Sequence, residues 1–193
     1  RDRASIGFLL AFWVIVSGCL QVIRQAKVGK PTRSFIGMQI AHLGIAVFVI
    51  GVTMVGAYQE EKDVRMAPGE MVQVGGYQIQ LQDVRQVPGP NYTAMRGTFL
   101  LNKNGVQQTA LYPEKRSYFS STMPMTEAAI DAGLTRDIYV SLGEELGDQS
   151  WAVRVYYKPF VDWIWGGCLL MALGGVFAIS DRRYRMKLKG QTT

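Results

Sequence analysis

Three long apolar segments constrain the fold of this chain more than any other feature. They cover residues 6–23, 35–58 and 160–179 and contain a single Asp, Glu, Lys or Arg residue, Asp162. A helix rises about 1.5 Å per residue, so about 20 apolar residues cross the hydrocarbon core of a bilayer. The pattern therefore predicts an integral membrane protein with about three α-helical spans.

Basic residues beside these segments predict the orientation in the membrane. Residues 24–34 and 181–193 are rich in Lys and Arg, whereas residues 59–158 contain ten basic and twelve acidic residues. Cytoplasmic loops carry the excess of Lys and Arg. We therefore expect residues 59–158 on the non-cytoplasmic side and both basic segments in the cytoplasm, in contact with the lipid bilayer. The basic residues do not share one folded surface, which argues against nucleic-acid binding despite the net charge of +6.

This pattern divides the chain into five parts. They are a first transmembrane helix with its basic cytoplasmic loop (1–34), a second transmembrane helix (35–58), a polar domain (59–158), a third transmembrane helix (159–180) and a cytoplasmic tail (181–193). A lipoprotein signal ending at Cys19 is disfavoured, because it would place the first basic loop outside. The first residue is Arg rather than Met, so we expect a piece of a longer protein or a processed chain.

The polar domain has the pattern of a small all-β fold. Residues 71–74 and 77–84 flank Gly75–Gly76, a strong hairpin signal. Two further strand pairs are predicted at residues 93–101 with 106–112, and at 138–142 with 151–157. Thr126 and Gly133 could cap a short helix over residues 126–132. The sequence therefore predicts an extracytoplasmic barrel, of OB-like or related topology, with one short helix.

His42 is the chain's one histidine and lies within the second apolar segment. Counted from Phe35, it lies on the order of 10 Å inside the span. An ionisable group in hydrocarbon needs a partner and is a functional-site candidate by default. It could be a structural histidine bonded to a neighbouring helix, a ligand of haem or another metal, or part of a proton relay. The nearby small residues Gly37, Ala41 and Gly44 would admit either another helix or a porphyrin face.

The polar domain contains no His or Cys, which excludes a Ser-His or Cys-His nucleophile within this chain. Glu144 and Glu145 are adjacent, so on a strand they would point to opposite faces. Residues 115–119 (KRSYF) mix bases with aromatic side chains and are either a docking patch or, by preference, a plain loop.

Four segments resemble the C-terminal region of the CcmF/NrfE haem-lyase family. They are residues 34–44 (SFIGMQIAHLG), 51–53 (GVT), 65–70 (RMAPGE) and 158–167 (KPFVDWIWGG). The resemblance covers essentially the whole chain. It implies a multi-pass protein of the bacterial inner membrane that acts in cytochrome c maturation, with residues 59–158 in the periplasm.

The resemblance also implies a function. Proteins of this family take haem from a periplasmic haem chaperone and attach it to apocytochrome c, together with other maturation subunits. They also hold a transmembrane b-type haem, and His42 matches one of its axial iron ligands. The family's tryptophan-rich segment, its periplasmic histidine pair and its second transmembrane histidine have no counterpart in this sequence. We therefore expect this chain to depend on the rest of its parent protein and not to be catalytic alone. The alternative is a non-enzymatic membrane scaffold with a periplasmic partner-binding barrel and a structural His42.

Overall fold

The computed structural model describes residues 2–181. These residues form two compact units, one of residues 2–58 with 160–181 and one of residues 59–159. Each unit is described by itself. The basic tail predicted at 181–193 lies, apart from Asp181, outside the described residues.

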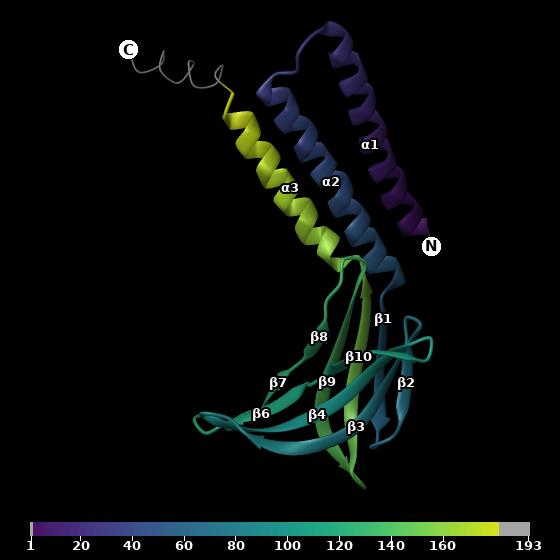
Figure 1. The fold of residues 1–193 in the computed structure, drawn as a ribbon, viewed down its shortest axis with the longest axis vertical. Coiled ribbons are helices and arrows are strands. Elements are labelled where there is room, and N and C mark those ends of the chain that lie inside the picture. Colours follow the sequence, from purple (N-terminus) through teal and green to yellow (C-terminus); the bar gives the residue numbers. More distant parts are fainter. Residues whose placement is uncertain (1, 182–193) are drawn as a thin grey trace. The chain divides into compact units, whose positions relative to one another are not determined.

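The first unit contains three helices, as the sequence predicts. They are α1 (Asp2–Val28), α2 (Arg33–Tyr58) and α3 (Val161–Ile179) (Figure 1). All three are long and apolar enough to cross a membrane.

Helices α2 and α3 pack through glycine at very short distance. Gly37 and Gly44 are buried on α2, and Gly167 and Gly174 are buried on α3. A Cβ atom added to Gly37 would lie 2.5 Å from the carbonyl oxygen of Gly174, and one added to Gly44 would lie 2.8 Å from that of Gly167. Small residues allow this close approach. Within a membrane there is no hydrophobic driving force between helices, so close van der Waals contact stabilises the pair instead.

The start of α2 is capped from two directions. The Thr32 hydroxyl oxygen accepts a hydrogen bond from the backbone N–H of Phe35 at 3.2 Å. The Asp181 carboxylate, just beyond α3, accepts one from the backbone N–H of Ser34 at 3.0 Å. Both satisfy donors that a helix leaves unpaired at its N-terminus. The buried Asp181 therefore ties the end of α3 to the beginning of α2.

The second unit is built from ten strands in two sheets. One sheet has the order β1-β10-β9-β8, and the other has the order β2-β3-β4-β6-β7, with β5 also paired to β4. The strands are β1 (Glu60–Met66), β2 (Met71–Val74), β3 (Tyr77–Pro88), β4 (Tyr92–Lys103), β5 (Val106–Leu111), β6 (Glu114–Tyr118), β7 (Met125–Glu127), β8 (Ala129–Asp131), β9 (Arg136–Gly147) and β10 (Ser150–Pro159).

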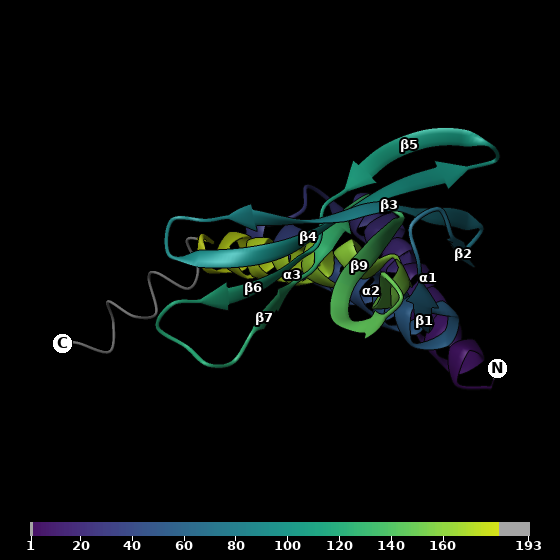
Figure 2. The same ribbon diagram turned by 90° about the horizontal axis from the view of Figure 1, so that it is seen from below.

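The two sheets enclose one hydrophobic core. Side chains that alternate along β3 and β4 meet those of β9 and β10 there, and the most buried are Ile79, Leu81, Phe99, Leu101, Ile138, Val140, Leu142 and Val155. The strands curl around this core as a β-sandwich or half-barrel (Figures 1 and 2). The predicted all-β fold class is confirmed. Among the described strands, the ladder does not close into a single ring.

The predicted hairpins are confirmed by register. β2 pairs with β3 so that Val74 lies opposite Tyr77 across Gly75 and Gly76, which both have positive φ. The ring of Tyr157 lies so close that a Cβ on Gly75 would be 2.3 Å from it. Glycine is therefore required at position 75 by both conformation and space. β4 with β5 and β9 with β10 also pair as expected.

The short helix predicted over residues 126–132 is wrong. This segment forms β7 and β8, which pair with β6 and β9 in different sheets. A seven-residue helix is marginal on its own because nucleation is costly, whereas here the neighbouring strands supply backbone hydrogen bonds. The preferred loop over residues 115–119 is also wrong, because Lys115 to Tyr118 belong to β6.

Candidate functional site

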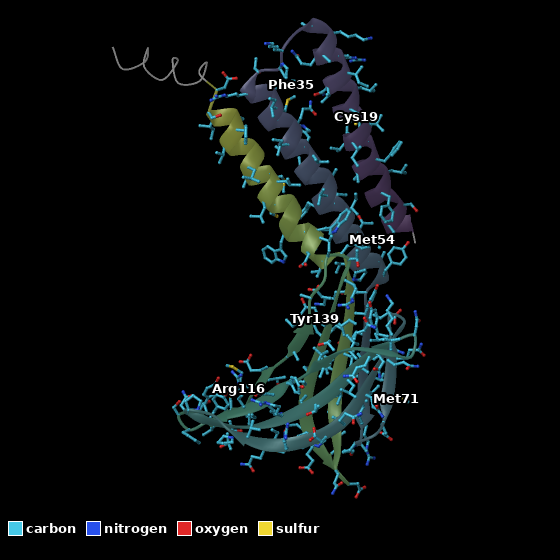
Figure 3. All side chains as sticks on the ribbon, in the orientation of Figure 1. Cys19, Phe35, Met54, Met71, Arg116 and Tyr139 are labelled. Carbon is cyan, nitrogen blue, oxygen red and sulfur yellow. The ribbon has the colours of Figure 1, made fainter. Side chains whose placement is uncertain are left out.

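His42 lies on the side of α2 that faces α1. It lines an apolar groove of about 410 Å³ between these helices, together with Gln39 and Leu43 of α2. The α1 wall consists of Val14, Ile15, Gly18, Cys19, Val22 and Ile23. Figure 3 marks Cys19 on α1. The volume lies within the range of small-molecule sites in proteins, which are mostly apolar with few polar groups.

A backbone hydrogen bond fixes the orientation of the His42 ring. Its Nδ1 lies 2.8 Å from the carbonyl oxygen of Met38, one turn earlier on α2. A carbonyl oxygen only accepts, so Nδ1 must carry the hydrogen. In the neutral imidazole this leaves the lone pair on Nε2. Metal-ligating histidines have this arrangement, in which one nitrogen donates to a carbonyl and the other binds the metal.

The small residues near His42 serve the opposite side of α2. Ala41 lies with Gly37 against Gly174 of α3, where a Cβ on Gly174 would be 2.5 Å from the Ala41 backbone nitrogen. Of the two roles predicted for the small residues, the structure supports helix packing. A porphyrin face has no room there, so the groove toward α1 is the place where His42 can meet a ligand.

A pair of glutamines crosses from α2 to α1 beside His42. The Gln39 side-chain nitrogen donates to the Gln21 side-chain oxygen at 2.9 Å. Gln39 precedes His42 by three residues and therefore shares its helical face. A Cβ on Gly18 would lie 3.1 Å from the Gln39 side-chain oxygen, so glycine gives this amide space. Sequence reasoning missed this pair, although two uncharged polar residues in apolar segments were a usable signal.

The groove offers iron a single nitrogen ligand from this chain. Among the described residues, no group of three His, Cys, Asp or Glu side chains lies close enough to hold a metal ion. One axial imidazole fits a haem, whose porphyrin supplies the other nitrogens and whose second axial ligand can come from another segment. It does not fit a zinc site, which needs three or four protein ligands.

In the second unit, Tyr77 of β3 binds two cations, Lys103 of the same sheet and Arg136 of the other sheet. Its hydroxyl oxygen accepts hydrogen bonds from Arg136 at 2.9 Å and from Lys103 at 3.1 Å. Burial would raise the pKa of Tyr77, but these bonds and the two positive charges favour the phenolate, so the pKa lies below its usual value. Arg136 also pairs with Asp131. The polar groups of this cluster pair with one another, which favours a structural role over a binding role.

A second cluster surrounds Glu114 on β6. Its buried carboxylate accepts hydrogen bonds from Arg96 at 2.6 Å and from Arg116 at 2.7 Å. Burial would raise the pKa of Glu114, but both guanidinium groups favour the charged form, so the pKa lies below its ordinary value of 4.5. Arg116, labelled in Figure 3, also stacks on the Tyr92 ring with 4.7 Å to its centroid.

The Glu114 cluster should make the stability of β4 and β6 depend on pH. Because its folded pKa is depressed, the carboxylate stabilises the fold fully above pH 4.5, and this contribution is lost as the pH falls through the folded pKa. Glu114→Gln should cost about 1–3 kcal/mol near neutral pH, and less in acid. Hydrogen exchange of peptides covering residues 92–118 would measure it, with the exposed Glu145→Gln as the matched control. An equal difference at every pH would contradict the assignment.

Comparison with known proteins decides the family. The protein-family model described as "CcmF C-terminal beta-sandwich" matches residues 57–159, which is more than half of the chain. The chain belongs to this family. The matched region coincides with the ten-stranded unit, and the resemblance noted in the helices extends beyond it.

Relatives and a solved structure agree with this assignment. The chain is 48% identical to the cytochrome c-type biogenesis protein CcmF of Pseudomonas fluorescens over 95% of its length. It is 44% identical to CcmF of Escherichia coli over 97% of its length, and 34% identical to NrfE of Haemophilus influenzae over 95%. It spans 28–29% of the length of these relatives. The structure of the cytochrome c heme lyase CcmF has the same fold, with a TM-score of 0.77, 19% identity, and coverage of 93% of this chain and 31% of that chain.

Proposed function

We propose that this chain is the C-terminal part of a membrane haem-lyase component that acts in cytochrome c maturation. The proposal is supported by the names of its relatives, which are cytochrome c-type biogenesis proteins, and by the fold it shares with a cytochrome c heme lyase. The three apolar helices fit a multi-pass protein of the bacterial inner membrane. The basic loop at 24–34 then lies in the cytoplasm and the β unit in the periplasm.

His42 is the proposed axial ligand of a b-type haem. The observation that carries this assignment is the hydrogen bond from Nδ1 to Met38, because it leaves Nε2 in an apolar groove as a ligand. A bound haem would supply an iron that changes its oxidation state by one electron. The chain has one histidine, so a second imidazole would come from another part of the parent protein.

The proposed partners are the haem chaperone, other maturation subunits and apocytochrome c. The chain would contribute one haem ligand and the β unit to this assembly. Attachment of haem to apocytochrome would also require the remainder of the parent protein, since the relatives are more than three times as long as this chain.

The proposed ligand can be tested in the full-length protein. His42→Ala should reduce the haem b content, measured as the pyridine haemochrome per protein, to about one tenth of wild type or less, because the axial bond from this chain is lost. Cys168→Ala on α3 is the matched control, since Cys168 lies outside the groove and its truncation should leave the haem content unchanged. An unaltered Soret band in His42→Ala would refute the assignment.

A structural His42 in a non-enzymatic scaffold is the second candidate. Its hydrogen bond to Met38 within α2 is an observation that also fits this role. Glutamine can donate a hydrogen bond but is a poor iron ligand, so His42→Gln separates the two candidates. Maturation of cytochrome c that persists in His42→Gln would favour the scaffold.

A further inference from the structure

A groove on the outer face of the four-stranded sheet remains without a role in the proposed haem chemistry. It has a volume of about 570 Å³ and lies across β1, β9 and β10, with Thr126 of β7 at its border. Along β10, Val153 and Val155 are buried in the core, so Ala152 and Arg154 point to the outer face. The groove therefore opens on the face of the sheet opposite the core, and its lining also includes Val64, Leu142 and Val153, which pack in or against the core.

The floor of the groove consists of small residues. They are Ser141 and Gly143 on β9 and Ala152 on β10. Ser141 lies opposite Arg154 in the register, and Ala152 lies opposite Arg65. A Cβ added to Gly143 would lie 3.0 Å from the Ala152 side chain, so a larger residue at position 143 would occupy part of the groove. Such a surface lets another backbone approach closely.

A β-bulge lies in this floor. Val153 pairs with Leu142, but Trp151 pairs with Glu145, so two residues of β9 oppose the single residue Ala152. A bulge interrupts the ladder, bends the strand and is over-represented beside functional sites. A second register shift follows between Trp151 and Ser150, so the pairing of β9 with β10 is irregular along this part of the groove.

The charged groups of the groove are already balanced. Arg154 donates to both carboxylate oxygens of Asp63, at 2.5 and 2.8 Å. Arg65 donates to the Ser150 hydroxyl at 2.7 Å and lies 3.7 Å from the Asp148 carboxylate. The Arg65 side chain is nevertheless 58% exposed and has five N–H donors, so it retains donors for a ligand.

These features favour an extended polypeptide over other ligands. The cations have acidic partners, so the groove lacks the net positive charge that phosphate or nucleic acid requires. A chain can lie over the small floor, continue beyond both ends, and present carbonyl oxygens to Arg65 and to the hydroxyl groups of Ser141 and Thr126.

We propose that this groove binds an extended segment of the apocytochrome polypeptide. The proposal rests on the proposed function, in which the unfolded apocytochrome is the polypeptide substrate. The β unit would then hold the substrate chain by its backbone, with little dependence on side-chain sequence.

The test is binding of a fluorescein-labelled apocytochrome c segment to the full-length protein, followed by fluorescence anisotropy. Ser141→Tyr fills the floor, and Arg65→Gln replaces the five N–H donors of the guanidinium with the two of an amide on a shorter side chain, without altering the floor. Each should weaken binding about tenfold. The matched controls are Gln107→Tyr on β5 and Arg85→Gln on β3, both at exposed positions outside the groove, and they should bind as wild type.

Two readouts keep this proposal separate from the haem site. His42→Ala should bind the segment as wild type, and both groove variants should retain the wild-type haem content. Their β unit should also resist limited proteolysis as wild type does, which verifies its folding. No binding of the segment to the wild-type protein, or equal binding by groove variants and controls, would overturn the proposal. Weakening by Arg65→Gln alone would support it if Ser141→Tyr failed to fold.

Discussion

Gly174→Leu is expected to destabilise the helical unit by about 3 kcal/mol. A Cβ atom at position 174 would lie 2.5 Å from both the Ala41 backbone nitrogen and the Gly37 carbonyl oxygen. These are backbone atoms of a helix, so no side-chain rotation can relieve the overlap. Helix α3 would have to separate from α2 and lose its close contacts. Thermal unfolding in detergent, followed by helical circular dichroism, would measure the loss.

The neighbouring residue gives a matched control. A Cβ on Gly175 would have no atom within 4 Å in the described structure, so Gly175→Leu should change stability by no more than about 0.5 kcal/mol. Both variants add the same side chain to the same helix. Equal effects would show that helix propensity, rather than the α2–α3 contact, dominates. Because Ala41 immediately precedes His42, Gly174→Leu should also lower the haem content.

The three helices could be predicted because apolar segments of this length form few structures other than a transmembrane helix. Their ends were less predictable: the first segment was expected at residues 6–23, but α1 continues to Val28. The extra turn contains Arg24 and Lys27. Long basic side chains can extend toward water while their backbone remains helical, so charge marks the membrane boundary rather than the helix end.

The strands that could be predicted have alternating side chains, as in Tyr77, Ile79 and Leu81 of β3. β1 escaped prediction because six of its seven residues are not fully buried and five are charged. It becomes a strand because it pairs with β10 along its whole length. Likewise, residues 126–132 have a local preference for a helix, but they form strands because the tertiary fold provides strand pairing.

The candidate site was predictable in part. His42 could be found as an ionisable residue in an apolar segment. The sequence could not show which neighbouring helix covers each face of α2, because the spacing of Gly37, Ala41 and Gly44 predicts only that something approaches closely. The structure assigns that face to α3 and leaves His42 and Gln39 toward α1. The groove over Ser141, Gly143 and Ala152 also requires strand register, which no local pattern contains.

The largest effect in the β unit is expected from Phe99→Ala, which should cost about 3–5 kcal/mol. Phe99 is 0% exposed and lies in the core between the two sheets. Its removal loses transfer free energy and leaves a cavity that packed strands cannot fully close. Phe119→Ala is the matched control, because Phe119 is 75% exposed and its truncation should change stability by no more than about 0.5 kcal/mol.

Limited proteolysis of the full-length protein under increasing denaturant would measure both variants through the cleavage of the β unit. If Phe99→Ala and Phe119→Ala were cleaved at the same denaturant concentration, the core described here would be wrong. The result also bears on the groove, since Val153 and Leu142, which pair with each other next to the bulge, share their core with Phe99. A loosened core should therefore weaken peptide binding without changing the haem content, because His42 belongs to the other unit.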